Sequence, residues 1–373
     1  MNIIRLANQK YFLGIFKMLE ELNIANLLPH QVEKLIKELT LLLNQQEKSS
    51  NVIYEIVKNE KNIVCCPICN SCNVVKNGHT KKGIQTYKCK DCDKRFNDLS
   101  NTIFHHTHLT YKQLVKFFEC MRDKFSIRKT AKLVSISVTT AFTLRHKILD
   151  VLRKIRENIK LHGRVEVDEY YISINLKGTK QENMPRFSKP RESKGNGKRG
   201  INSHKVCVES AIDEYDNTFL EIVGNGPITS EMAKNSLTTK LKNVSELITD
   251  CKSSYESVAK ENNWNLIQIK SGTYTNEDGD SLANINSLHS GLEVFLSHFH
   301  GGSTNHLQGY LDWYMFDKYL NYTTEILEQV EVIEKNTISK TSNITYSNVY
   351  NNYSGLDYNA IYSDYNYHAN SST

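Results

Sequence analysis

Long apolar segments are missing from this chain of 373 residues. No run approaches the roughly 18–20 apolar residues that a membrane-spanning helix needs. The first residues also lack the uninterrupted apolar core of a signal peptide, and the chain has no internal repeats. We therefore expect a soluble, cytoplasmic protein without a membrane partner, long enough for two or three domains at roughly 100–200 residues each.

A disulfide framework is not expected either, although the chain contains nine cysteines. Disulfides rarely persist in the cytoplasm, because its thiols are kept reduced. Six of the nine cysteines lie between residues 65 and 92. Cysteines that gather in a reducing compartment are typical of a metal site.

Acidic residues are scarce in one part of the chain. Residues 76–160 contain 20 Lys and Arg against 7 Asp and Glu, a balance of +13 in a chain whose net charge is +6. The rest of the chain is therefore acidic, at −7. A basic segment on an acidic protein favours a nucleic-acid partner, although charge alone also allows a merely solvated basic face.

Two Cys-x-x-Cys motifs lie within the cysteine cluster, Cys66–Cys69 and Cys89–Cys92, with 19 residues between them. Zn²⁺ prefers four thiolates in a tetrahedron, and each motif supplies two sulfur atoms from one turn. Residues 74–78 and 85–88 can supply the strands. We predict a zinc ribbon over residues 61–100 with a structural Zn²⁺, and leave Cys65 and Cys72 as spare thiols. A thioredoxin-like redox role would not explain why the motifs are paired.

Residues 101–160 are helical and basic, and they contain the pattern of two helices joined by a tight turn. The helices are expected over residues 126–134 and 138–152, with Ser137 as the N-cap of the second. Hydroxyl side chains at the start of a recognition helix can read bases, and basic ones hold phosphates. The side chains that we predict to contact DNA are Thr139, Thr140, Thr143, Arg145 and Lys147. A helical hairpin without DNA contacts is the alternative.

Residues 161–325 alternate between β-rich and helical segments, which is typical of an α/β domain with a mixed sheet and flanking helices. Strands are expected over residues 164–172, 205–213, 218–223, 245–250 and 265–270, and helices over residues 230–242 and 253–262. The basic segment 177–200 either clamps a phosphate backbone or is a plain surface insertion. Outside this domain, residues 1–60 are expected to be helical and residues 336–373, rich in Tyr, Asn and Ser, to be disordered.

Two of the expected strands carry aspartates that can share one site. Asp168 lies in the first strand and Asp250 ends the fourth, and strand ends of α/β sheets gather ligand-handling residues. Two such carboxylates can hold Mg²⁺ or Mn²⁺. Successive side chains of a strand point to opposite faces of the sheet, so the neighbouring Glu169 is expected on the face opposite to Asp168. A third ligand is expected on a following helix that Asn286 opens. His289 and Glu293 lie near the same helix face and are supporting candidates.

Each of these residues has a simpler interpretation when it is taken alone. A single aspartate at a strand end is most often a cap, and a single histidine such as His289 is most often structural. The joint pattern is what favours a metal site.

These segments together resemble the zinc-ribbon insertion-sequence transposases of the fifteen-ninety-five family, which are ISXO-two-like and related to the eukaryotic Merlin elements. The resemblance covers residues 62–316 and is carried, in order, by CPxC, YKCKDC, FxxRHKIL, VEVDEYYI, TDCKSSY and NSLHSGLEVFL. It implies an RNase H-like catalytic fold with Asp168, Asp250 and Asn286 at the metal-site positions. Asparagine is common at the third position of the family.

The resemblance also implies the reaction and the partners. A transposase of this kind nicks the transposon end by hydrolysis, and the freed 3′-hydroxyl attacks target DNA. Double-stranded DNA, as transposon ends and as target, would be the partner, and the chain would act as a homo-oligomer, associated with the nucleoid if the host is bacterial. One departure is Glu293, where the family usually has a lysine that would contact a phosphate.

Three functions are compatible with these observations to different degrees. The leading one is a transposase that binds the terminal inverted repeats of its element and catalyses metal-dependent cleavage and strand transfer. The alternative is a catalytically inactive or repurposed DNA-binding protein, which Glu293 favours. A zinc-ribbon transcription or replication factor would not explain the two strand-end aspartates.

Overall fold

The computed structural model describes residues 65–81, 83–177, 205–270, 272–273, 275–323 and 329–337, with residue 57 and short stretches between 340 and 356. The chain divides into two compact units. The first contains Met1–Phe118 and Ile333–Thr341, and the second contains Glu119–Val332 and Ser342–Thr373. The boundaries between the units fall within two helices, α4 (Tyr111–Arg122) and α11 (Gln329–Thr337).

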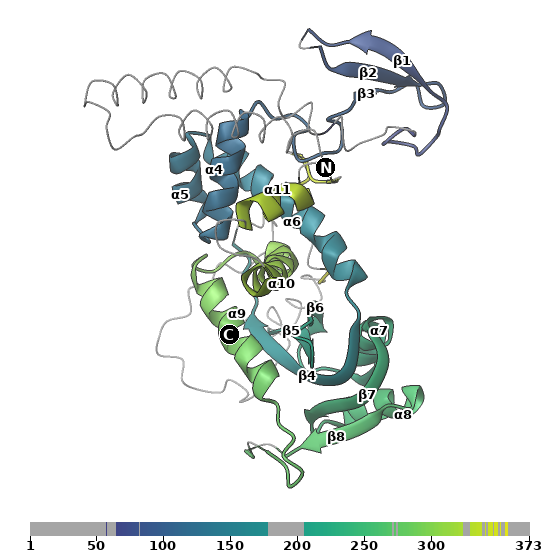
Figure 1. Cartoon of the computed structure of the whole chain (residues 1–373), viewed down its shortest axis with the longest axis vertical. Coiled ribbons are helices and arrows are strands. Elements are labelled where there is room, and N and C mark those ends of the chain that lie inside the picture. Colours follow the sequence, from purple (N-terminus) through teal and green to yellow (C-terminus); the bar gives the residue numbers. More distant parts are fainter. Residues whose placement is uncertain are drawn as a thin grey trace, which may run out of the picture. The chain divides into compact units, whose positions relative to one another are not determined.

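The first unit contains a small antiparallel sheet in the order β1-β2-β3 (Figure 1). Its strands are β1 (Val74–His79), β2 (Gln85–Cys89) and β3 (Arg95–Asn97). The first two agree with the predicted strands. The third was not predicted, because it has three residues and only one apolar side chain, Phe96. That side chain is buried and stacks on Tyr87 with the ring centroids 5.5 Å apart, so the third strand closes the small core.

Two consecutive helices of the second unit, α5 (Ile127–Val134) and α6 (Val138–Asn158), are joined by a three-residue turn. Ser126 and Ser137 are their N-caps, and each side chain accepts a hydrogen bond from a backbone N–H of the first turn. Ser135 ends α5 in the left-handed conformation. Ser137 is thus the N-cap that the sequence predicted, whereas Ser126, expected inside the first helix, precedes α5 as its cap. The helix α6 continues past its expected end at residue 152.

A five-stranded mixed sheet forms the centre of the second unit, in the order β6-β5-β4-β7-β8. Its strands are β4 (Leu161–Ser173), β5 (Lys205–Asp213), β6 (Thr218–Asn225), β7 (Leu241–Asp250) and β8 (Asn265–Ile269). The strands β4, β5 and β6 are antiparallel neighbours, whereas β7 runs parallel to β4 and β8 parallel to β7. The predicted mixed α/β class is confirmed.

Alternation along β4 divides its side chains between two covered faces. Val165 and Val167 belong to the main apolar core. Residues of α7 (Ser230–Lys240) and α8 (Ser253–Asn262) complete that core. On the other face, Glu166 contacts the start of α9 (Ala283–Ser297). The central strand therefore lies between the helix pair α7–α8 and the helix α9 (Figure 1).

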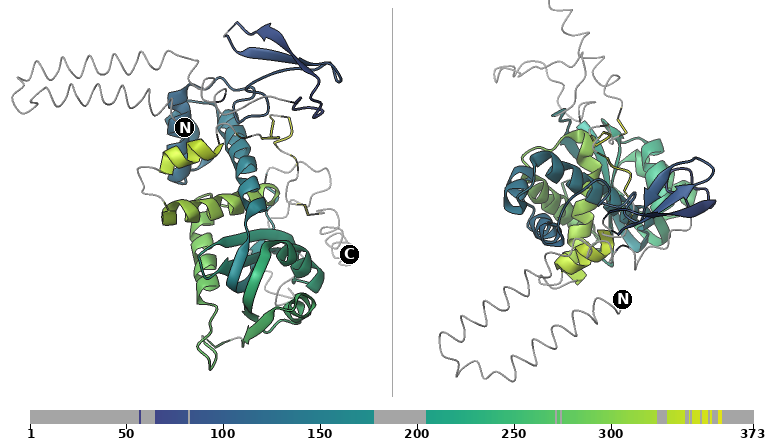
Figure 2. Two further views of the ribbon diagram at one scale, coloured as in Figure 1. Left: turned by 45° about the vertical axis from the view of Figure 1, so that its right-hand side comes forward. Right: turned by 90° about the horizontal axis from the view of Figure 1, so that it is seen from above.

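A short 3-10 helix, η2 (Thr304–His306), leads into α10 (Leu307–Thr323). The helix α10 packs across α6 and beside the edge strand β6 (Figure 2). Gly309 lets α10 approach α6 closely, since a Cβ at this position would lie 3.2 Å from the Leu149 side chain on α6. The Gln308 side chain accepts a hydrogen bond of 2.8 Å from the backbone N–H of Ile222 on β6. The helix α10 thereby joins α6 to the sheet.

Three predicted segments lie wholly or largely outside the described residues, namely the N-terminal helical segment, the basic segment 177–200 and much of the tail 336–373. Within the tail, Ser342 Oγ and the backbone N–H of Asn343 donate hydrogen bonds to Asp150 on α6. Ile344 and Val349 are buried. Ser342 and Asn343 of the tail therefore contact α6. No helix in the described part of the chain has the length and apolarity needed to cross a membrane.

Candidate active site and metal centre

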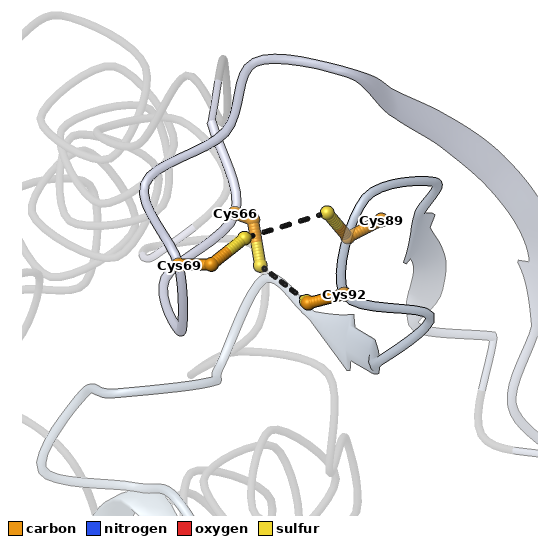
Figure 3. A group of neighbouring side chains, drawn as sticks. All are labelled: Cys66, Cys69, Cys89 and Cys92. Atoms are coloured by element: carbon orange, nitrogen blue, oxygen red, sulfur yellow. Dashed lines mark hydrogen bonds between the residues drawn. The ribbon is translucent and has the colours of Figure 1, made fainter.

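Four thiols gather where the two Cys-x-x-Cys turns meet beside β2 (Figure 3). The sulfur atoms of Cys66, Cys69, Cys89 and Cys92 all lie within 4.8 Å of one another. The Cys66–Cys92 and Cys69–Cys89 sulfur pairs are 3.7 and 3.6 Å apart. Four sulfur atoms at about 2.3 Å from one tetrahedral Zn²⁺ would be about 3.8 Å from each other. The cluster therefore fits a metal ion of this kind.

Local hydrogen bonds shape the cysteine cluster. Asp91, inside the second motif, accepts hydrogen bonds from the side chains of Ser71 and Asn73, and so ties one turn to the other. The backbone N–H of Cys92 acts against burial and lowers the pKa of the Cys89 thiol to about 7. Cys89 is therefore closer to the thiolate form that binds metals, whereas the pKa values of Cys69 and Cys92 are raised in the metal-free cluster.

The two cysteines left as spare thiols form a disulfide, Cys65–Cys72. The expectation that the chain has no disulfide is therefore wrong at this position. The backbone N–H of Cys66 donates to Ser71 O at 2.7 Å, so the turn between Cys66 and Ser71 folds back on itself. That turn brings the flanking residues 65 and 72 together, and sequence spacing alone does not reveal it.

Asp168 and Asp250 lie on adjacent parallel strands at the same level of the sheet. The register pairs Glu166 with Ile248, so two residues further along Asp168 stands beside Asp250, where β7 ends. Asp168 Oδ1 accepts the backbone N–H of Glu169 at 2.8 Å, whereas the buried Asp250 Oδ1 makes no hydrogen bond among the described residues. A buried carboxylate oxygen without a donor suits a cation.

The pKa of Asp168 and the position of a nearby lysine also suit a site that binds a cation. Burial raises the pKa of Asp168 to about 6, although the charge of Lys252 acts in the opposite direction. The Lys252 ammonium lies 2.8 Å from Asp250 Oδ2 and 3.6 Å from Asp168 Oδ1. One lysine therefore contacts both carboxylates, and nothing in the local sequence distinguishes it from a surface lysine.

Lys252 also forms an ion pair with Glu169, whose side chain is fully buried. Glu169 faces away from Asp168, as alternation predicts, toward the α7–α8 side of the sheet. Because β7 ends at Asp250, a side chain that follows it can reach carboxylates on both faces of β4. Glu169 is therefore joined to the aspartates through Lys252.

Asn286 lies on α9, and contacts on either side of it fix its level on the sheet. Glu166 Oε2 accepts the backbone N–H of Ile285 at 2.9 Å, and Glu166 Oε1 accepts the Asn284 side chain at 2.7 Å. Further along, the ring of Tyr170 stands 5.2 Å from that of His289. Asn286 lies between these contacts on the helix, and Asp168 lies between them on the strand. The exposed Asn286 amide is thus near the level of Asp168.

Glu166 was missed by the sequence analysis although it anchors α9. The helix has no side-chain cap of its own at Leu282, so its first free N–H groups need an external acceptor. Glu166 supplies one from β4, where it lies between the buried Val165 and Val167. Glu166 could have been identified from the sequence because it is acidic and lies two positions before Asp168, on the same face of the strand.

The two supporting candidates on α9 differ in their environment. His289 is mostly buried, and burial lowers its pKa to about 4, so its imidazole is neutral at pH 7. Glu293 is exposed, and its charge adds to the burial that raises the pKa of Tyr170. Tyr170 is therefore near both residues, and all three lie on the side of the sheet that carries Asp168.

The predicted DNA contacts divide into two groups. Thr139 is exposed and Thr140 is partly exposed, but Thr143, Arg145 and Lys147 are buried. The Arg145 guanidinium donates to Phe125 O and Thr130 Oγ1 and lies 5.2 Å from the centre of the Trp313 ring. A guanidinium held in this way cannot reach a phosphate on the surface. The structure therefore gives Arg145 a packing role in place of the predicted one.

Comparison with known proteins identifies the region that contains the acidic site. Residues 160–317 match the sequence profile described as an ISXO2-like transposase domain. A protein of Halobacterium salinarum described as an uncharacterized protein in transposable element ISH50 is 29% identical over 153 residues, which are 41% of this chain and 50% of the relative. The chain thus spans about half the length of this curated relative. Residues 160–317 are thus similar to an ISXO2-like transposase domain.

Solved structures with some similarity include two transposase complexes. The Mos1 strand transfer complex has 14% sequence identity, with 62% of this chain and 79% of that chain covered, and a TM-score of 0.24. A pre-cleavage Mos1 transpososome has 12% identity, with 61% and 79% covered, and a TM-score of 0.19. Scores of this size do not establish a shared fold.

Proposed function

We propose that this chain binds the terminal inverted repeats of its element and catalyses metal-dependent cleavage and strand transfer of DNA. The observation that carries the proposal is the pair Asp168 and Asp250 on adjacent strands beside α9, within a transposase domain. We also assign the sheet to the RNase H-like fold, which the resemblance implies. If the five strands β4 to β8 are numbered 1 to 5 along the chain, their order across the sheet is 3-2-1-4-5. The second strand, β5, is antiparallel to the first, β4.

Asp168, Asp250 and the amide oxygen of Asn286 would hold one or two Mg²⁺ or Mn²⁺ ions, which would activate water and stabilise the leaving oxygen of a phosphate ester. The free oxygen of Asp250 supports this assignment. Glu166 positions Asn286 by holding the start of α9 on the sheet. The neutral His289 adds no positive charge beside the carboxylates.

We infer that DNA is held outside the acidic site by surfaces on each unit. On α5 and at the start of α6, Arg128, Lys129, Lys132 and Thr139 are exposed, and they replace the buried Arg145 and Lys147 as candidates. On the zinc ribbon, Lys90, Lys94 and Arg95 are exposed. Basic side chains at such positions hold the phosphate backbone and set the register on the duplex. Pairing of two element ends would require a homo-oligomer.

The proposal is tested by cleavage of a labelled DNA duplex that carries the element's own end, in Mg²⁺ or Mn²⁺. Wild type should cut the end, and Asp250→Ala should reduce the rate by about 10²–10³-fold or more, as the loss of a major electrostatic contribution does. Asp278→Ala, an exposed aspartate in the loop before α9, is the matched control and should cut like wild type. Equal rates for wild type and Asp250→Ala would contradict the proposal.

A non-catalytic DNA-binding protein is the second candidate, and the exposed carboxylate of Glu293 is the observation that favours it. A negative charge on the α9 surface near Tyr170 repels a phosphate backbone that approaches the acidic site. Tight binding of the element's end by wild type, without cleavage in either ion, would support this candidate. A zinc-ribbon transcription or replication factor would leave the Asp168–Asp250 pair unexplained.

A further inference from the structure

Lys252 occupies an unfavourable position for its own helix. It is the N-cap of α8, and its side chain makes no capping hydrogen bond. Helix N-termini favour Ser, Thr, Asp or Asn at this position and disfavour positive charge, because the free N–H groups point outward. The three surrounding carboxylates of Asp168, Glu169 and Asp250 offset this cost. The position of Lys252 is therefore explained by the acidic site rather than by the helix.

The formal charges of this group leave room for a divalent ion. Three carboxylates carry −3 and Lys252 carries +1, so the group is left with −2 in the absence of a metal. The ammonium contacts the two aspartates from which a divalent ion would have to displace it. Glu169 is the carboxylate that remains, since it lies on the opposite face and is fully buried.

We propose that Lys252 is a resident cation that holds Asp168 and Asp250 together before the divalent ion binds, and that Glu169 retains the ammonium when the ion enters. This inference rests on the proposed function, since it assumes that the two aspartates bind a metal. Lys252 is then a positioning residue that acts through the aspartates. It lowers the affinity of the site for metal, and Glu169 limits that effect by drawing the ammonium away.

Mn²⁺ binding to the zinc-loaded full chain, measured by electron paramagnetic resonance without DNA, tests the proposal. Lys252→Met removes the competing charge and should tighten Mn²⁺ binding by about tenfold or more. Glu169→Gln leaves Lys252 with the aspartates alone and should weaken Mn²⁺ binding by several-fold. Lys260→Met, at an exposed position on the same helix, should bind Mn²⁺ like wild type.

The opposite signs of the two variants separate this role from structural damage, which would weaken binding in both. Unchanged or weaker binding by Lys252→Met, or tighter binding by Glu169→Gln, would overturn the inference. Asp250→Asn serves to separate it from the proposed function. If Asp250→Asn binds Mn²⁺ as wild type does, the metal site itself is wrongly assigned. If Asp250→Asn loses Mn²⁺ while Lys252→Met has no effect, only the role of Lys252 fails.

Discussion

The cysteine cluster and the acidic site are both suited to a metal, but they are built in different ways. The four thiols come from two turns that one short hairpin joins, and their sulfur atoms already lie at the spacing of a tetrahedral site. The proposed acidic site would take Asp168, Asp250 and Asn286 from two strands and a helix. Its carboxylates are held by an ammonium from the chain itself.

The difference follows from what each site contributes to the molecule. The core beside the thiols is small, made of Cys66, Cys89 and Phe96 with a few partly buried neighbours, so a bound metal is needed to stabilise it. The acidic site lies on a sheet whose own core is large. Lys252 offsets one of the three negative charges there, and no metal is needed to hold the sheet together. A metal should therefore be structural in the first site and exchangeable in the second.

The largest expected effect comes from breaking the thiol site. Cys89→Ser should lower the zinc content from about one ion per chain to none and unfold the ribbon, because structural zinc supplies about 10–16 kcal/mol of apparent binding free energy to such domains. Elemental analysis and limited proteolysis within residues 65–100 measure both effects. Cys251→Ser, at an exposed cysteine after β7, is the control. If the ribbon stays protease-resistant without zinc, the thiol site does not need its metal for folding and does not differ from the acidic site in this respect.

A smaller effect is expected where the acidic site meets DNA. Glu293→Lys replaces a repelling charge with an attracting one, and should raise the affinity for the element's end by about 3–10-fold while increasing the steepness of its salt dependence by about one unit. Fluorescence anisotropy over a series of salt concentrations measures both quantities.

The matched control for that change is Glu231→Lys, at an exposed position on α7, which covers the opposite face of the sheet. It adds the same charge and should leave the affinity nearly unchanged. An equal gain in both variants would mean that net charge alone governs binding. An unchanged affinity of Glu293→Lys for the element's end would show that DNA does not contact this surface of α9.

The smallest effect concerns Glu209, which pairs with Glu169 across β4 and β5 and is fully buried. Burial raises the pKa of Glu209 well above its usual range. Above about pH 4.5 the folded chain therefore keeps a proton on Glu209 that the unfolded chain has lost. The free energy of unfolding falls as the pH rises from about 4.5 toward the raised pKa of the folded state. Glu209→Gln removes this dependence, and should raise the melting temperature by a few degrees at pH 8 and by less at pH 5.5. An equal change at both pH values would exclude titration of Glu209 as the cause.

Much of the secondary structure could be predicted because its signals are local. The hydroxyl of Ser137 marked the start of α6, and the alternating segments gave the strands of the mixed sheet. The short strand β3 carries too few apolar residues to give such a signal. The Cys65–Cys72 disulfide depends on the shape of one turn, which spacing does not encode.

The acidic site was only partly accessible from the sequence. Asp168 and Asp250 stood out because each carboxylate interrupts or ends an apolar strand. Lys252 did not, because a lysine after a strand is ordinary until its partners are known. Arg145 was misjudged for a related reason. Its helix is covered by Trp313 of α10, which lies far along the chain, so no local pattern distinguishes it from a surface arginine.

The most direct test of the account is a change of metal preference at Asp250. In Asp250→Cys a thiolate replaces the carboxylate, and sulfur binds Mg²⁺ poorly but softer divalent ions better. We predict that this variant fails to cut the element's end in Mg²⁺ and regains part of its cleavage in Mn²⁺, whereas Asp250→Ala fails in both. If the folded, DNA-binding cysteine variant cuts equally well in Mg²⁺ and Mn²⁺, Asp250 does not bind the catalytic metal and the account is contradicted.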